Sequence, residues 1–402
     1  MDVGFGTALL IVGLLLSVSA ALSGVMRGTV LSISVLSVAA GIVLAATDAV
    51  TIDSGASSVV HTIELALVVT LFSDGLFVER ELLRMHWTPA ARAIVIAMPV
   101  TLVLLALFAR VLFPDLTWAE AFLLGAVLCP TDPVVTSAVV TARRVPALVR
   151  HTLNLESGLN DGLALPFVLF FLVLASPGGN AGHEALKLLG ESVAGAAIGV
   201  ALAFLAGRLL PHLPRGGITP RYEGIYALGL GFAAFGIADV TIGNGLIAAF
   251  VAGIALGVAE HDIPDAFVEF NENVSTVLQA VTFFLFGALI VATGYDGNVW
   301  PLIAFIGFTL LIARPAAILA ALAGSGLERR FKVFIAWFGP KGVASMLFAL
   351  FVLNSDAPDR ALIFDIASFV ILSSIVAHGL TDTVGARWIE RGESGINRPP
   401  AG

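Results

Sequence analysis

Apolar stretches long enough to cross a lipid bilayer recur along the whole of this chain. Its 402 residues are 58% hydrophobic and only 12% charged, and their mean hydropathy is +0.98. A helix needs about 20 apolar residues to span the hydrocarbon core, whereas soluble domains carry about 25% charged residues. We therefore predict an all-α polytopic membrane protein that is surrounded by the lipid bilayer.

Hydropathy divides the chain into thirteen predicted spans. The first range lacks a basic start and a cleavage site, so we expect it to be a span and not a removed signal peptide. We expect one membrane unit over about 1–386 and a short cytoplasmic tail over 387–402. The predicted spans cover about 4–22, 29–46, 59–78, 91–112, 118–140, 149–174, 188–210, 223–240, 243–260, 275–293, 299–322, 333–353 and 362–385.

The basic residues are distributed unevenly between alternate loops. Of the 21 Lys and Arg residues, sixteen fall on one side of this topology and three on the other, and Arg314 and Lys341 fall inside spans. Cytoplasmic loops are enriched in Lys and Arg, so the split predicts an outside N-terminus and a cytoplasmic C-terminus, as in a prokaryotic inner membrane. The chain has no basic stripe for nucleic acid. Its single cysteine, Cys129, excludes an intrachain disulfide and a multi-thiolate metal site.

Helix-breaking residues interrupt two of the predicted spans near their middles. Residues 129–133 of the fifth span read Cys-Pro-Thr-Asp-Pro, and residues 339–342 of the twelfth read Gly-Pro-Lys-Gly. In an arrangement of six, one and six spans, these positions are equivalent in two halves of opposite orientation. Paired interruptions of this kind indicate a transporter binding site, because unwound backbone at that depth must be buried in protein or line a water-filled cavity.

The sixth span carries a polar run beside an apolar continuation. A charge at the bilayer centre costs at least ~2.5–3.5 kcal/mol, so we interpret Asp161 as the carboxylate that carries an ion. Burial favours the neutral form of a carboxyl group, so a proton and a cation can compete for it. Hard cations such as Na⁺ prefer oxygen ligands, and Ser157 and Thr131 are the expected further ligands. Alternatively, these two hydroxyls only bond to their own backbone.

The other buried charges have structural interpretations. Arg314, in the eleventh span, needs a partner because its charge cannot be removed, and we expect Glu156 to be that partner; the alternative is that Arg314 extends to an interface. Where two interrupted helices cross, an acid compensates the positive helix ends and a base the negative ones. We assign Asp132 and Lys341 to these roles, with contact between Asp132 and the ion through water as a secondary role.

Two further residues bear on how ions are exchanged. Asn160, next to Asp161, is neutral, so a single titrating carboxylate exchanges one monovalent cation for one proton without net charge movement. Asp74 lies near the cytoplasmic end of the third span. It is a candidate for the ion entrance, although an acid that stabilises a helix end is the simpler explanation.

On these motifs the chain resembles the NhaP-type sodium/proton antiporters, whose superfamily includes the eukaryotic sodium/proton exchangers. The resemblance covers nearly the whole chain and is carried by residues 131–133, 156–162, Arg314 and residues 339–342. It implies an NhaA-like fold, in which two inverted six-helix repeats contain the discontinuous fifth and twelfth spans. It also implies a homodimer, and a core bundle of about 91–174 and 299–385 that moves like an elevator against a dimerisation bundle of about 4–78 and 188–293.

The resemblance also implies roles for individual residues. In such families the aspartate matching Asp161 binds the ion, the Asn160 position marks the electroneutral branch, and Glu156 pairs with the arginine matching Arg314. Two features depart from the pattern. Lys341 replaces a common arginine, and the acid of the third span is displaced by one position, about 100° around the helix.

The expected function is therefore exchange of Na⁺ or Li⁺ for H⁺ by a protein that is not an enzyme and needs no cofactor. A K⁺/H⁺ antiporter of the same fold is the main alternative. More remote ones are an intramembrane aspartyl protease that uses Asp132 and Asp161, and a passive channel. The protease reading gives Arg314 and Lys341 no role.

Overall fold

The computed structural model describes residues 5–26, 33–82, 87–132, 145–177, 181–209, 220–259 and 265–394. Every regular element of these residues is a helix, which confirms the all-α prediction. The helices are α1 (Phe5–Met26), α2 (Ile33–Ala46), α3 (Ser57–Leu82), α4 (Thr88–Arg92), η1 (Ala93–Ala97), α5 (Met98–Leu112), α6 (Trp118–Leu128), α8 (Ala147–Ala175), α9 (Ala181–Leu209), α10 (Pro220–Asp239), α11 (Gly245–Ala259), α12 (Asp265–Thr293), α13 (Val299–Phe308), η4 (Thr309–Ala313), α14 (Arg314–Ala321), α15 (Arg329–Trp337), α16 (Val343–Leu353) and α17 (Arg360–Ser394).

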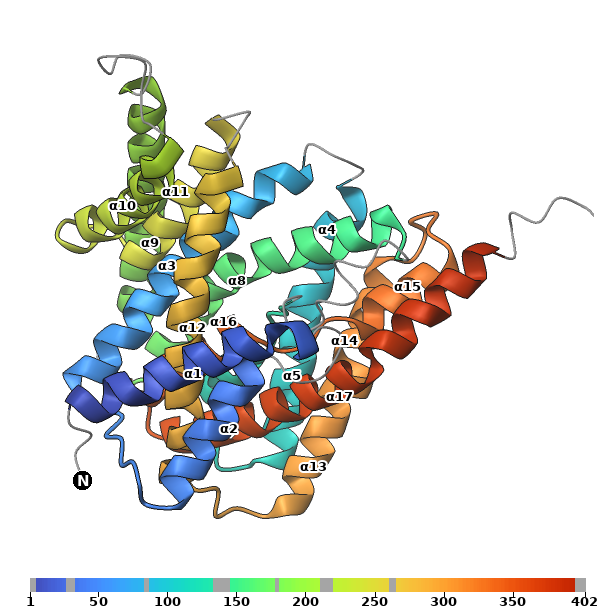
Figure 1. Cartoon of the computed structure of the whole chain (residues 1–402). Coiled ribbons are helices and arrows are strands. Elements are labelled where there is room, and N and C mark those ends of the chain that lie inside the picture. Colours follow the sequence, from blue (N-terminus) through green and yellow to red (C-terminus); the bar gives the residue numbers. More distant parts are fainter. Residues whose placement is uncertain are drawn as a thin grey trace, which may run out of the picture.

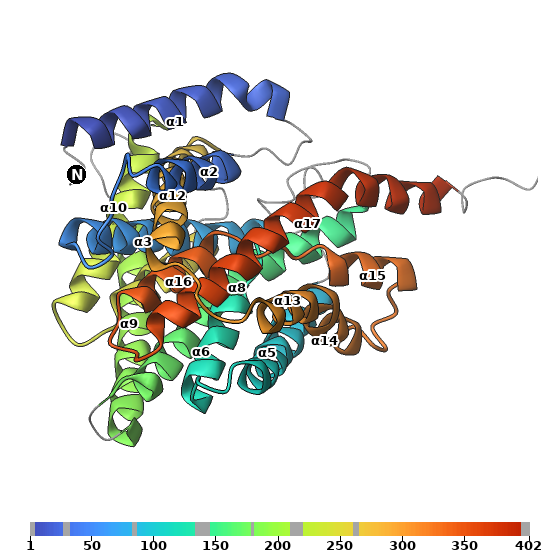
Figure 2. The same ribbon diagram turned by 90° about the horizontal axis from the view of Figure 1, so that it is seen from below.

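The helices form two groups that lie side by side, with α8 and α16 between them (Figures 1 and 2). One group consists of α1–α3 and α9–α12, in which α12 packs on α2 and α11 packs on α3 and α9. The other consists of α4–α6, α13–α15 and α17, in which α5 packs on α6 and α14 on α15. Contacts of α3 with α8 and α16 join the two groups. Residues far apart in sequence therefore meet at the centre.

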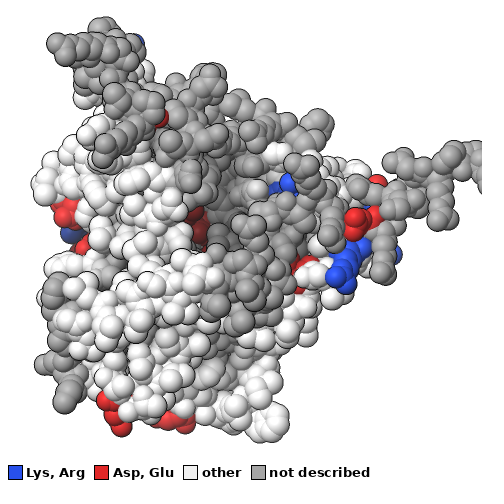
Figure 3. All heavy atoms as spheres, viewed as in Figure 1, with Lys and Arg blue, Asp and Glu red and all other residues white. Residues whose placement is uncertain are grey.

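The described surface is largely apolar. Figure 3 shows mostly uncharged side chains, with Lys, Arg, Asp and Glu gathered mainly near the edges of this face. Bulky apolar residues such as Val111 (75% exposed) and Leu311 (63% exposed) project outward. Such exposure would be costly in water but matches a hydrocarbon environment.

Within the described residues, seven helical stretches are long and apolar enough to cross a membrane, and five shorter helices are also apolar. The count of thirteen spans remains a prediction, since part of the fifth predicted span (133–140) lies outside the described residues. The last helix, α17, continues past the predicted end of the last span near 385 and reaches Ser394.

Two helices contain a widened π-helical turn that the sequence analysis did not predict. The turns are Ala93–Ala97 and Thr309–Ala313, and a proline follows each of them, Pro99 and Pro315. Proline lacks an N–H and clashes with the carbonyl four residues earlier, which here lies inside the widened turn. The second π turn ends directly before Arg314, the first residue of α14.

Glycine permits the close contact between α3 and α11. A Cβ atom at Gly253 would lie 2.3 Å from the carbonyl oxygen of Phe72, and one at Gly75 would lie 2.5 Å from that of Phe250. These backbones approach each other as small residues allow in membrane helices. The contact holds α3 against α11, and α3 in turn contacts the central helix α8.

This contact predicts a strong effect of one added methyl group. We expect Gly253→Ala to lower the thermal stability in detergent by about 1–3 kcal/mol, because its Cβ would meet backbone atoms that cannot give way. Gly236→Ala is the matched control, since a Cβ there meets nothing within 4 Å. Thermal unfolding followed by size-exclusion chromatography measures both. Equal stability of the two variants would contradict this packing.

Candidate cation-binding site

The interruptions of the two broken spans lie against each other at the centre of the molecule. Helix α6 ends at Leu128, and residues 338–342 separate α15 from α16. The backbone N–H of Asp132 donates to the carbonyl oxygen of Pro340 across 2.9 Å. Each break therefore supplies a hydrogen-bond partner to the other.

Two buried charged side chains complete this crossing. Oδ2 of Asp132 accepts from the backbone N–H of Val343, the first residue of α16, at 3.1 Å. Nζ of Lys341 donates to the carbonyl oxygens of Pro130 (3.2 Å) and Cys129 (3.5 Å), which follow the end of α6. The acid thus lies at a helix N-terminus and the base at a helix C-terminus, where each is favourable.

Both glycines of the second break make room for side chains of the site. A Cβ atom at Gly339 would lie 2.0 Å from the guanidinium carbon of Arg314, and one at Gly342 would lie 2.2 Å from Cβ of Asp132. Lys341, between them, is only 1% exposed, and its backbone N–H donates to Oγ of Ser374 at 2.9 Å. The Gly-Pro-Lys-Gly sequence therefore serves close packing as well as chain interruption.

Arg314 and Glu156 form a buried, bidentate ion pair. Nη1 of Arg314 lies 2.6 Å from Oε1 of Glu156, and Nη2 lies 3.2 Å from Oε2. The two residues are 7% and 4% exposed. Planar guanidinium and carboxylate groups match in this geometry, which a lysine could not reproduce. The pair joins α14 to α8 one turn before Asp161.

Asp161 lies on α8 and is 6% exposed. Its Oδ1 atom is buried and has no hydrogen-bond partner among the described residues, and the same holds for Oδ1 of Asn160. Buried acceptors without donors are uncommon, and a cation can satisfy them. Ser157, 7% exposed, lies one helical turn before Asp161.

The side chain of Asn160 binds a neighbour on the broken helix. Its Nδ2 donates to Oγ1 of Thr131 across 2.8 Å. Thr131 itself is 1% exposed. This bond connects α8 to the first break and orients the threonine hydroxyl, a role that sequence analysis did not assign to Asn160.

The structure brings Asp74 into the site, against the simpler expectation of an acid at a helix end. The carboxyl group of Asp74 lies close enough to that of Asp161 for the two to share a proton. Oδ2 of Asp74 is also buried without a partner in the described part of the chain. The glycine next to Asp74 was the sequence feature that could have indicated this position. Gly75 on α3 and Gly162 on α8 both allow their helices to pack closely on Phe250 of α11. The site therefore contains two adjacent carboxyl groups.

The likeness to known proteins extends over most of the chain. This chain is 27% identical over 330 residues to the K(+)/H(+) antiporter NhaP of Alkalimonas amylolytica, and the alignment covers 81% of this chain and 57% of that one. It is also 27% identical over 328 residues to the K(+)/H(+) antiporter NhaP2 of a Shewanella strain (MR-4), covering 80% and 56%. The chain thus spans little more than half the length of these relatives.

A solved structure has the same fold. The sodium proton antiporter MjNhaP1 of Methanocaldococcus jannaschii superposes with a TM-score of 0.78 at 20% identity, covering 95% of this chain and 98% of that one. Fold and relatives together define the class: integral membrane proteins of the fold that antiporters of monovalent cations and protons adopt. The chain belongs to the transmembrane sodium/hydrogen exchanger family, which it matches over residues 9–385.

The ion pair predicts an asymmetric response to substitution. Removing one partner of a buried pair costs about 3–5 kcal/mol, because the other charge stays buried alone. We expect Arg314→Met to lose most of the folded yield and the double variant Arg314→Met/Glu156→Leu to recover part of it. Monodisperse protein after detergent extraction is the measurement. If Arg314→Met alone is as stable as wild type, the pair does not support the fold.

Proposed function

We propose that this chain exchanges Na⁺ or Li⁺ for H⁺, with Asp161 binding the cation and the proton in turn. The observation that carries the proposal is the buried Oδ1 of Asp161, which has no donor among the described residues. In addition, no Lys or Arg of the described residues forms an ion pair with this carboxyl group. A permanent basic partner would have blocked both occupants.

The further ligands follow from the neighbours of Asp161. We propose that Ser157 and Thr131 supply oxygens to the cation and that Asn160 holds Thr131 in place. Asp132 serves mainly to compensate the α16 N-terminus and contacts the ion through water. Hard monovalent cations accept such a mixture of carboxylate, hydroxyl and water oxygens.

The adjacent Asp74 is compatible with electroneutral exchange. Two carboxylates in contact do not both carry a charge without a proton or cation between them. One proton shared by Asp74 and Asp161 leaves a single negative charge in the pair. One monovalent cation or one further proton neutralises it, so the exchange is one for one and moves no net charge.

The larger architecture is part of the same proposal. Thirteen spans form two inverted repeats, with the N-terminus outside and the C-terminus in the cytoplasm of an inner membrane. The bundle of about 91–174 and 299–385 carries the site, and the bundle of about 4–78 and 188–293 forms a homodimer. The bundle that carries the site moves relative to the bundle that forms the homodimer, like an elevator. Asp74 then lies on the dimerisation bundle and Asp161 on the moving one, so Asp74 meets arriving ions at the border between them.

A second candidate is K⁺/H⁺ exchange at the same site. It is favoured by the names of relatives that align with 80% or more of this chain. Selectivity between Na⁺ and K⁺ depends on the distances among the oxygen ligands once an ion is bound. The two candidates share Asp161 and differ only in the cation.

Exchange in proteoliposomes tests the proposal. A pH gradient is imposed, Na⁺, Li⁺ or K⁺ is added outside, and a dye reports the pH of the lumen. We expect wild type to dissipate the gradient with Na⁺ or Li⁺, and Asp161→Asn to match protein-free liposomes because its side chain has no charge to exchange. Asp239→Asn makes the same chemical change at an exposed helix end and should retain the wild-type rate.

Two outcomes would revise the proposal. Full activity of Asp161→Asn would contradict the assignment of the carboxylate. Wild-type activity with K⁺ but not with Na⁺ or Li⁺ would establish the second candidate and leave the site unchanged.

A further inference from the structure

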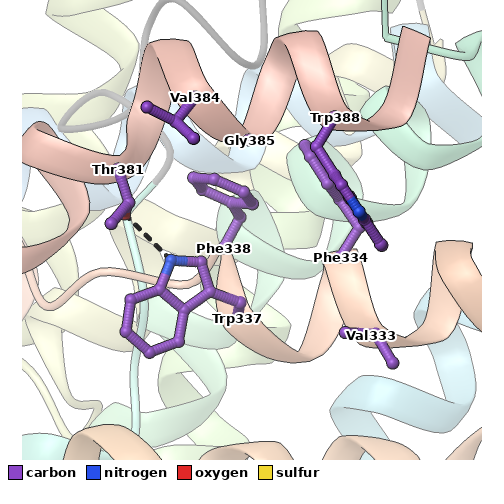
Figure 4. A pocket seen from close by; sticks show the side chains of 8 residues that line it. All are labelled: Val333, Phe334, Trp337, Phe338, Thr381, Val384, Gly385 and Trp388. Carbon is purple, nitrogen blue, oxygen red and sulfur yellow. Dashed lines mark hydrogen bonds between the residues drawn. The ribbon is translucent and has the colours of Figure 1, made fainter. Parts of the chain in front are cut away.

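A shallow apolar groove lies between α15 and α17, apart from the cation site (Figure 4). It encloses about 270 Å³. Seven of the eight lining residues present carbon surface, among them Trp337 and Trp388. The lining consists of Val333, Phe334, Trp337, Phe338, Thr381, Val384, Gly385 and Trp388.

The groove offers no free polar group to an occupant. Its single hydroxyl, on Thr381, accepts from the indole Nε1 of Trp337 at 2.9 Å, as Figure 4 shows, and itself donates to the backbone of α17. The floor forms because Gly385 lacks a side chain: a Cβ there would lie 2.2 Å from the Phe338 ring. The rim is open, since Val384 is 67% and Trp388 is 49% exposed. An apolar chain fits this shape, and a hydrated molecule does not.

Basic residues lie at one end of the groove. At about 100° per residue, Arg330 projects from the same face of α15 as Phe334 and Trp337, one and two turns before them. Arg329 is its neighbour, and Arg387 lies on α17 beside Trp388. Figure 3 shows Lys and Arg side chains on this side of the molecule, with Asp and Glu side chains beside them.

Arg330 has donors to offer an anion. Its Nε donates to Glu328 at 2.7 Å, and a guanidinium has five N–H donors in all. The Arg330 side chain is 18% exposed and lies over the Phe331 ring, whereas Glu328 is half exposed. A partly exposed ion pair of this kind contributes little to stability, so a phosphate can compete with Glu328. The planar fork suits the oxygens of a phosphate group.

We propose that the groove binds an anionic phospholipid. One acyl chain lies along Trp337 and Trp388, and the phosphate contacts Arg330 at the basic end. Three features favour a lipid: tryptophans concentrate where a membrane protein meets the headgroups, the lining is carbon, and the charge at the end is positive. Because other lipid tails can fill an apolar groove equally well, the headgroup provides the selectivity.

The position of the groove gives its occupant access to the second break. Phe338 directly precedes Gly339, whose Cα lies against Arg314. The carbonyl oxygen of Trp337 is 2.9 Å from Nε2 of His378, and Nδ1 of that ring lies 3.2 Å from the Ser374 hydroxyl that receives the Lys341 N–H. A lipid that holds Trp337 and Phe338 in place thus contacts the residues that lead into the crossing.

Quenching of tryptophan fluorescence by brominated lipid tests this proposal. Trp87, Trp118 and Trp300 are changed to Phe, which leaves Trp337 and Trp388 of the five tryptophans. The full chain is reconstituted in phosphatidylcholine vesicles in which one third of the lipid is either brominated phosphatidylglycerol or brominated phosphatidylcholine. We expect stronger quenching by the brominated phosphatidylglycerol. Arg330→Gln should reduce this preference about 5-fold, whereas Arg330→Lys should keep most of it.

Lys332→Gln is the matched control. It removes the same charge from the same helix, but Lys332 lies about 160° around α15 from Arg330. It should leave the preference unchanged. Equal quenching by the two lipids would overturn the headgroup contact, as would equal effects of Arg330→Gln and Lys332→Gln. No quenching by either lipid would show that a protein segment or a second copy of the chain covers the groove.

Discussion

The structure depends on the hydrogen bonds that two unwound segments exchange in the middle of the bundle. An unpaired peptide group in hydrocarbon costs several kcal/mol, so interrupted helices persist there only if each freed group finds a partner. Asp132 hydrogen-bonds to residues at the break between α15 and α16 through both its backbone N–H and its carboxylate. The ammonium group of Lys341 donates to the carbonyl oxygens that follow the end of α6. Arg314 packs against Gly339 and secures α8 through Glu156.

The other buried charges at this crossing are compensated, which distinguishes them from Asp161. Glu156 is balanced by Arg314, while Asp132 and Lys341 lie at helix ends of opposite sign. Asp161 and Asp74 also lie at this centre, and neither forms an ion pair with a Lys or Arg of the described residues. A site with an excess of acid and with buried, unsatisfied oxygens needs a cation or a proton to be stable. That need is the physical basis of the proposed exchange.

The sequence was sufficient to predict the features that follow from the free-energy cost of burying a charge or an unpaired backbone group. A buried Arg314 requires an acid, and Glu156 was within reach on a polar stretch; the breaks at 129–133 and 339–342 were visible as proline and glycine. Three features were missed. The approach of Asp74 to Asp161 depends on glycine contacts between helices, which the sequence does not place. The hydrogen bond from Asn160 to Thr131 depends on side-chain rotamers. Each π turn contains the residue four positions before a proline, and the sequence analysis did not use that relation.

The central claim is that cation and proton compete for one carboxyl pair, and proton release on ion binding tests it most directly. Purified protein in weakly buffered detergent solution is titrated with Na⁺, Li⁺ or K⁺ in the absence of any gradient, and a dye reports released protons while calorimetry reports bound cation. The account predicts about one proton released per cation bound, and neither event in Asp161→Asn. Cation binding by wild type without proton release would contradict it.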